Sequence, residues 1–212
     1  MSDKKNFWIF ALSSVVYWTQ GIESLPSQGL FYHWKENLNF SPEKIMLISS
    51  IMTFAWLVKP PIGYIVDNFF SKKIWIFTAL ALDVALVFFI GSLQLPLFIL
   101  IFALILNSTN AAFRDVAVDG IMCVEGKKSN STGKIQSIQW ISISAALLLA
   151  GIGGGYIAQK WDYRIAFLAL IPVYLAVAVV AHFYKEERRG VLQYAPTTLL
   201  SDMKRLFADK RL

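Results

Sequence analysis

Charged and amide side chains interrupt several long apolar stretches of this sequence, and they are the residues best suited to chemistry. Gln20 and Glu23 lie in one such stretch, and Arg114 and Asp115 are adjacent in another, where we expect them to form a buried pair. Carboxylate, amide and guanidinium groups of this kind can hold an ion or a polar solute through charge-assisted hydrogen bonds. Ionisable groups are costly to place among apolar side chains, so by default they indicate a functional site.

Asp119 extends the charged run around Arg114. It follows Asp115 by four residues, so the two carboxylates would share one face of a helix. One interpretation is a charge cluster that handles a proton or a solute. The other is structural, with Asp119 paired to Lys72 or Lys73 and holding an inner gate. The sequence leaves both interpretations open.

Three further polar residues have two possible roles each. Lys59 stands just before two prolines, and its ammonium could either snorkel to the inner membrane interface or meet an anionic solute. Asp83 could pair with Lys59 or with Arg114. Trp140 shares the beginning of a later apolar stretch with two glutamines, and it could face a cavity or simply pack.

Other chemistries lack the residues that they need. His33 and His182 are far apart and Cys123 is the only cysteine, so neither a metal site nor an internal disulfide is expected. There is no phosphate-binding loop, which argues against ATP-driven work by this chain. No nucleophile and base stand out as a pair. We therefore expect no enzyme activity, no metal and no cofactor.

The composition indicates the elements that must position these residues. The chain of 212 residues is 56% hydrophobic and 16% charged, with a mean hydropathy of +0.53. A helix needs about 20 apolar residues to cross a bilayer, and lipid offers the backbone no hydrogen-bond partners. The sequence therefore predicts an all-α membrane protein with six transmembrane helices, at residues 7–34, 45–66, 74–93, 95–122, 135–158 and 165–184.

The first predicted span contains a break. Gly21 and Pro26 weaken the helix on either side of Glu23. A rise of about 1.5 Å per residue from Phe7 puts Gln20 and Glu23 near the middle of the membrane, where transporters bind solutes at interrupted helices. The alternative is a kinked helix that leaves Glu23 at the outer interface.

Loop charges predict the orientation. Most of the 20 lysines and arginines fall in pieces that are cytoplasmic if the N-terminus is inside, and the outer pieces hold only Lys35, Lys44, Lys160 and Arg164. The positive-inside rule then places both termini in the cytoplasm. The net charge of +6 forms no basic stripe with interleaved aromatics, so nucleic acid is not an expected partner.

The segment between the second and third predicted spans carries a known motif. Gly63, Asp67, Lys72 and Lys73 are spaced as in the loop motif of the major facilitator superfamily, although Asn68 replaces the usual basic residue and Phe70 the usual glycine. The glycine would allow close helix approach, Asp67 could meet a helix N-terminus, and the lysines would lie at the anionic inner leaflet. With Asp119, these residues are the predicted gate. An ordinary basic loop is the alternative.

A narrower resemblance covers most of the chain. Six runs are similar, in order and spacing, to the folate-biopterin transporter family: residues 17–21, 31–35, 38–42, 56–63, 115–119 and 133–140. The resemblance implies the N-terminal half of a transporter. Residues 1–184 would be the six-helix bundle, and residues 185–212 a basic cytoplasmic connector to a C-terminal half.

The resemblance also implies a function. It is secondary active transport of a small, possibly folate- or pterin-like, solute by alternating access. The partners would be the lipid bilayer around the helices and a coupling ion, either a proton or sodium. Muropeptide permeases carry similar acidic patterns, so another solute remains open, as does a scaffold without transport activity. Spans one and four line the cavity in the superfamily, which indicates Gln20, Glu23, Arg114 and Asp115 as binding residues. Lys59, as a cation for an anionic solute, and Trp140, if it faces the cavity, complete the predicted binding set.

Overall fold

The fold is a bundle of helices. The structure, a computed structural model, describes residues 2–186, with the side chains of residues 7–186. The predicted connector therefore lies almost wholly outside the described residues. Within them the regular elements are α1 (Ser2–Ile22), α2 (Ser27–Tyr32), the π-helix η1 (His33–Asn37), α3 (Pro42–Leu57), α4 (Lys59–Asn68), α5 (Lys72–Ser92), α6 (Leu97–Ser129), α7 (Thr132–Lys160), α8 (Tyr163–Leu168) and α9 (Ile171–Phe183).

Five stretches of the described chain are long and apolar enough to cross a membrane. They are Pro42–Asn68, Lys72–Ser92, Leu97–Ser129, Thr132–Lys160 and Tyr163–Phe183. These spans confirm the prediction of an all-α, multi-pass membrane protein. The first predicted span begins with α1, which is more polar because it contains Ser13, Thr19 and Gln20. The six-span prediction thus corresponds to five clear spans and one more polar helix.

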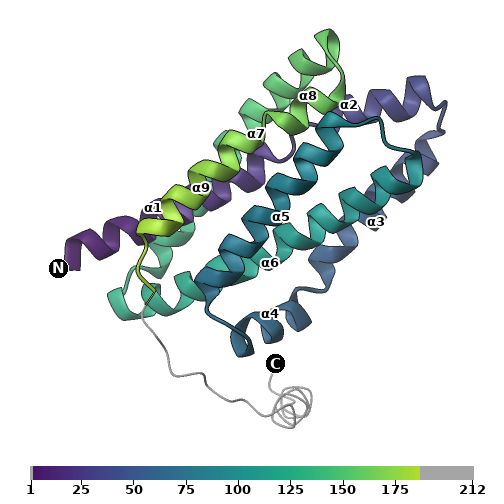
Figure 1. Cartoon of the computed structure of the whole chain (residues 1–212). Helices are drawn as coiled ribbons and strands as arrows, with labels where there is room; N and C mark the ends of the chain where they lie inside the picture. The colour runs from purple at the N-terminus through teal and green to yellow at the C-terminus, as the bar shows by residue number, and fades with distance from the viewer. Residues whose placement is uncertain (1, 187–212) are drawn as a thin grey trace, which may run out of the picture.

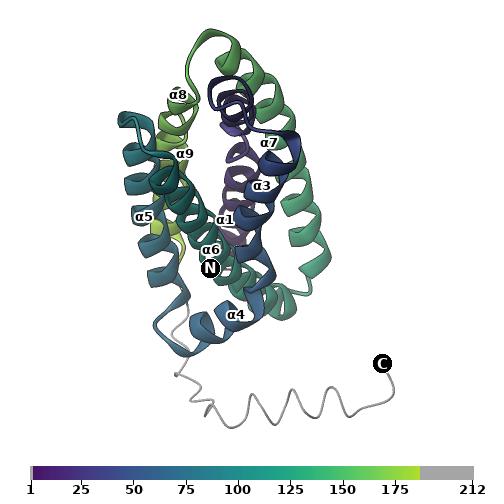
Figure 2. The ribbon, with the colours of Figure 1, turned by 90° about the vertical axis from the view of Figure 1, so that its right-hand side faces the viewer.

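The arrangement makes α6 the central helix. It contacts α1, α3, α4, α5 and α7, and the turned view shows α6 and α1 between α5 and α7 (Figure 2). In Figure 1 the long helices run side by side, and α4 lies at one end of the bundle. Polar residues on α6 therefore face several neighbours at once.

Helix starts follow local capping chemistry. The hydroxyl of Ser71 accepts a hydrogen bond from the backbone N–H of Ile74 at 3.3 Å and begins α5, and Asp162 does the same for Arg164 at 2.9 Å and begins α8. Such caps satisfy N–H groups that have no partner inside the helix. They fix where α5 and α8 enter the bundle.

Two predicted spans are interrupted. Residues 23–26 form turns between α1 and α2, as Gly21 and Pro26 predicted. The second span is also divided, at Val58, which the sequence analysis did not predict. The signal was present, because Pro60 and Pro61 follow and a proline supplies no backbone N–H to the preceding turn. This break places Lys59 at the first position of α4.

Gly21 has a different role from the one expected. A Cβ at Gly21 would lie 2.5 Å from the carbonyl oxygen of Ile143 and 2.6 Å from the Cβ of Ala146. Only a glycine lets α1 and α7 approach this closely. Gly21 therefore holds α1 against α7 and fixes the position of the residues that follow it.

Candidate functional site

Arg114 is the centre of a buried ion cluster. Its side chain is 0% exposed, and its two terminal nitrogens donate to Glu23, in the turn after α1, and to Asp83 on α5. Its guanidinium carbon also lies 5.4 Å from the centre of the Tyr174 ring on α9. One arginine on α6 therefore contacts three other parts of the bundle: α5, α9 and the turn that follows α1.

Asp83 is the most enclosed carboxylate of this cluster. Its side chain is 0% exposed. Besides Arg114, it accepts hydrogen bonds from Asn110 at 2.7 Å and from Asn107 at 3.2 Å, one and two turns before Arg114 on α6. Of the two partners that the sequence left open for Asp83, Arg114 is the one observed. Buried carboxylates require this number of donors, since each lost bond to water must be replaced.

Lys59 and Asp115 form a second ion pair beside the first. The Lys59 ammonium lies 2.5 Å from Asp115 Oδ2, and the amide of Gln20 donates to the other oxygen, Oδ1. The ammonium also lies 4.4 Å from the centre of the Trp56 ring. The Lys59 side chain therefore turns toward Asp115 on α6, and its role as a cation for a solute stays a prediction.

The predicted pair between Arg114 and Asp115 is wrong. The hydrogen bonds of Arg114 go to Glu23 and Asp83, and those of Asp115 come from Lys59 and Gln20. Consecutive residues of a helix point in different directions, so two neighbours in sequence do not face each other. The two side chains belong to separate ion pairs on different sides of α6.

Asp119 belongs to this polar region and not to the loop lysines. It accepts a hydrogen bond from the Tyr17 hydroxyl at 2.8 Å, and the Gln139 amide lies at 3.5 Å. The predicted alternative, a pair with Lys72 or Lys73, is not observed. Lys72 binds Asp67 at 2.6 Å, and Lys73 donates to the carbonyl oxygens of His182 and Tyr184. Both lysines are occupied by other partners, Lys72 by Asp67 and Lys73 by the carbonyl oxygens at the end of α9, so neither pairs with Asp119.

We call this region the polar row. It runs across α1, the turn after it, α4, α5, α6 and α7, and its members are Tyr17, Gln20, Glu23, Lys59, Asp83, Arg114, Asp115, Asp119 and Gln139. Five of the six predicted binding residues belong to it. The sixth, Trp140, is 64% exposed on α7, and its binding role stays a prediction. Tyr17, Asp83 and Gln139 were not among the predicted site residues.

Apart from Asp119, the predicted gate residues lie in α4 and at the beginning of α5. Asp67 is paired with Lys72, and its side chain is 64% exposed. The expected reason for Gly63 is wrong, because a Cβ there would meet only the Val116 side chain at 3.8 Å, an ordinary contact. Gly63 therefore does not permit a close helix approach within the described residues.

Glu186 completes this loop, and the sequence analysis missed it. Its carboxylate accepts hydrogen bonds from the backbone N–H groups of Lys72 at 3.1 Å and Lys73 at 2.9 Å. A carboxylate is favoured there by the free N–H groups and the dipole at the beginning of α5. The available signal was an acid among the bases that follow the last span. We call Asp67, Lys72, Lys73 and Glu186 the loop cluster.

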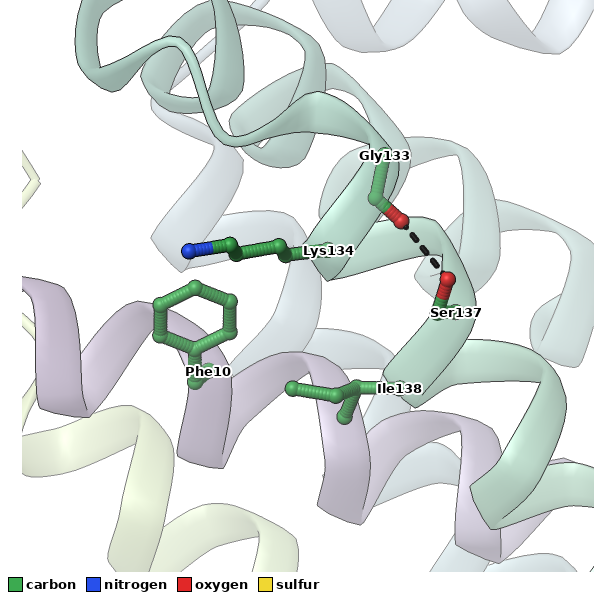
Figure 3. Close-up of a pocket in the computed structure, with 5 residues that line it drawn as sticks. All are labelled: Phe10, Gly133, Lys134, Ser137 and Ile138. Carbon is green, nitrogen blue, oxygen red and sulfur yellow. Dashed lines mark hydrogen bonds between the residues drawn. The ribbon is translucent and has the colours of Figure 1, made fainter.

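A surface hollow lies apart from both clusters. It measures about 600 Å³ and is lined by Phe10 of α1 and by Gly133, Lys134, Ser137 and Ile138 of α7. Figure 3 shows Lys134 extended beside the Phe10 ring, while the Ser137 hydroxyl is turned back to the Gly133 carbonyl oxygen at 2.9 Å. With one charged group and a widely open shape, it offers few of the convergent polar contacts that orient a solute.

Comparison with known proteins identifies relatives that match most of the chain. The model of the BT1 family matches residues 20–208. In Arabidopsis thaliana, "Probable folate-biopterin transporter 4" is 28% identical over 171 residues, which cover 76% of this chain and 34% of the relative. "Probable folate-biopterin transporter 8, chloroplastic" is 24% identical over 199 residues, covering 90% of this chain and 36% of the relative. The chain thus spans little more than a third of the length of these relatives.

Proposed function

The chain belongs to the BT1 family, and we propose from this premise that it is the N-terminal, membrane-embedded half of a transporter for a folate- or pterin-like solute. The observation that carries the proposal is the polar row. It places two cations and four carboxylates between helices that are otherwise apolar. Charges at such positions mark solute and ion pathways in membrane proteins. The two relatives compared above are described as transporters, and neither is described as an enzyme.

Exposure divides the polar row into structural and binding groups. The Arg114 and Asp83 side chains are 0% exposed, whereas Lys59 is 34% and Glu23 15% exposed. A solute can reach the second pair without displacing the first. Arg114 and Asp83 then hold Glu23 in place, while Glu23 and Lys59 contact the solute.

The two solute-contacting side chains, Glu23 and Lys59, suit the two ends of a folate. A carboxylate accepts two parallel N–H bonds from an amidine-like edge, which a pterin has, and Glu23 would do this. Lys59 would meet the glutamyl carboxylate. The Trp56 ring, already beside the Lys59 ammonium, offers an aromatic face on which a flat ring can stack. Trp140 is a second candidate for stacking, from α7.

The transport cycle would be alternating access. Residues 1–184 would rock as one bundle against a second six-helix half, to which residues 185–212 would connect, with the N-terminus in the cytoplasm. The loop cluster would stabilise one gate state. The coupling ion would be a proton or sodium.

A ligand screen on the full-length protein tests this function. Purified protein in detergent would be heated with biopterin, folic acid, a muropeptide or a nucleoside cofactor, and the Tm recorded. Stabilisation by biopterin or folic acid supports the proposal if the effect of folic acid is lost in Lys59→Met. It should be retained in the control Lys44→Met, which changes an exposed residue in the first turn of α3. Stabilisation by the muropeptide alone would identify a different permease. No stabilisation by any solute would favour a scaffold.

A further inference from the structure

The charges of the polar row do not balance. Within the part of the chain that the structure describes, the row contains two cations, Arg114 and Lys59, and four carboxylates, Glu23, Asp83, Asp115 and Asp119. Arg114 serves Glu23 and Asp83, and Lys59 serves Asp115. Asp119 alone among the four receives its hydrogen bonds from neutral groups.

The hydrogen bonds of Asp119 leave one oxygen available. Both the Tyr17 hydroxyl, at 2.8 Å, and the Gln139 amide, at 3.5 Å, are directed to Oδ1. No hydrogen bond to Oδ2 is found in residues 7–186. A proton on Oδ2 would therefore leave both existing bonds intact. Neither Arg114 nor Lys59 has to move for this proton to bind.

Asp119 is half-buried between helices, and its surroundings favour a neutral acid. On its own helix, α6, Asp115 lies one turn earlier on the same face, and Cys123 one turn later. From α4, the charge of Lys59 is near but its ammonium is bound to Asp115 at 2.5 Å. From α5, Lys72 lies along Gly120 but pairs with Asp67. Among the described side chains of α1 and α7, Tyr17 and Gln139 are the ones that bind it. An ionised carboxylate without a bound cation is costly in such a place.

We propose that Asp119 binds the coupling proton on Oδ2, and that this proton accompanies an anionic solute. The step balances simply: a proton from water converts the carboxylate to a neutral acid, and its release to water on the other side restores the charge. Tyr17 keeps its own proton and acts as a positioning residue, since its hydroxyl only donates to Oδ1. The inference rests on the proposed function and assigns its coupling ion.

The link between proton and solute is electrostatic. With Asp119 ionised, the set of Asp115, Asp119 and Lys59 carries one net negative charge, which opposes a carboxylate arriving at Lys59. With Asp119 protonated, this set is neutral. Protonation of Asp119 therefore raises the affinity for the anion, and bound anion raises the affinity of Asp119 for the proton. By linkage, the two affinities increase by the same factor.

The test measures folic acid binding to the purified full-length protein between about pH 6 and about pH 8, where the carboxylates of free folic acid are already ionised. Affinity should fall with rising pH by up to roughly tenfold per unit, the limit for one linked proton. Asp119→Asn should bind folic acid tightly with no such dependence. The matched control Asp162→Asn, at the exposed cap of α8, should behave like the wild type. If the folic acid affinity of Asp119→Asn depended on pH as the wild type does, the proposal would be overturned. It would also be overturned if the wild-type affinity depended on sodium and Asp119→Asn abolished that dependence.

A second measurement needs no solute and so separates this inference from the proposed function. Infrared spectroscopy of the protein in liposomes detects the carbonyl stretch of a protonated carboxyl. A band that titrates in the wild type and in Asp162→Asn should be absent in Asp119→Asn, and its persistence there would overturn the proposal even if folic acid binds. If Asp119→Asn fails to insert, Tyr17→Phe should keep the band and move its pH midpoint upward, because the ionised form has lost a donor. A pH midpoint in Tyr17→Phe equal to that of the wild type would also contradict the proposal.

Discussion

The polar row and the loop cluster are both built from acid–base pairs, but their surroundings differ. Arg114 and Asp83 are both 0% exposed, whereas in the loop cluster Asp67 is 64% exposed and Lys72 is 18% exposed. A buried charge that loses its partner stays desolvated, while an exposed one is solvated by water. The same kind of contact therefore determines folding in one region, and in the other it can be made and broken during a cycle.

The largest loss of stability should come from Arg114→Gln. The change leaves Glu23 and the fully buried Asp83 without a cation, so the free energy of unfolding should fall by roughly 3–5 kcal/mol. The control is Arg164→Gln, whose pair with Asp162 is partly exposed and should contribute less than about 1 kcal/mol. Thermal or denaturant unfolding in detergent gives both values.

The rescue of this variant tests which partner matters. Adding Asp83→Asn to Arg114→Gln should restore part of the lost stability, because it removes the unpaired buried charge. Adding Asp115→Asn should not, since Asp115 is bound to Lys59. If Asp115→Asn rescued and Asp83→Asn did not, the assignment of the two ion pairs would be reversed.

A double-mutant cycle on Lys59 and Asp115 should give an intermediate effect. Lys59→Met, Asp115→Asn and the double variant should show a coupling energy of roughly 0.5–3 kcal/mol, as expected for groups in direct contact. The same cycle on Lys72 and Asp67 should give about 0.2–1 kcal/mol. Equal coupling in the two cycles would remove the distinction between the polar row and the loop cluster.

Phe70→Gly should stabilise the protein. Phe70 has a φ of 60°, a left-handed conformation that costs a residue with a side chain about 1–2 kcal/mol. Glycine adopts it freely, so a gain of about 1 kcal/mol is expected in thermal unfolding. Phe69→Gly, at a φ of −117°, is the matched control and should give no gain. A loss of stability in Phe70→Gly would mean that the exposed ring makes contacts worth more than the strain.

The smallest effect on stability should come from Asp67→Asn. The exposed pair with Lys72 contributes less than about 1 kcal/mol, so the amount of inserted protein should be near normal. Uptake should nonetheless decrease, because one gate state loses a contact. Comparing uptake per inserted molecule in Asp67→Asn and Glu43→Gln distinguishes the two effects, and equal uptake would exclude a gate role for Asp67.

Local features of the sequence were sufficient to predict where the long helices lie. Hydropathy depends on neighbours along the chain, and Gly21 with Pro26 indicated the turn at residues 23–26. The sequence was also sufficient to select five members of the polar row, since charges in apolar stretches are few. The break at Val58 could have been predicted from the two prolines that follow it.

Partner choice could not be predicted, for a physical reason. Arg114 reaches Asp83 because α5 and α6 pack together, and that packing depends on side chains all along both helices. The adjacent Asp115 looked like the nearer partner only because sequence distance ignores rotation about the helix axis. Glu186 likewise binds the backbone N–H groups of Lys72 and Lys73 at the beginning of α5, which lie 114 and 113 positions away in the sequence. The close approach at Gly21, in place of the one expected at Gly63, was equally a property of packing.

The central claim is that the exposed side of the polar row binds the solute, and Glu23→Gln tests it most directly. Glutamine keeps the shape of the side chain, and Arg114 keeps Asp83, so the protein should still insert. Biopterin affinity, measured by calorimetry on the full-length protein, should fall roughly tenfold to hundredfold, as expected for losing hydrogen bonds to a charged group. Glu43→Gln, an exposed change at the beginning of α3, should bind as the wild type does. Wild-type biopterin affinity in Glu23→Gln would contradict the account.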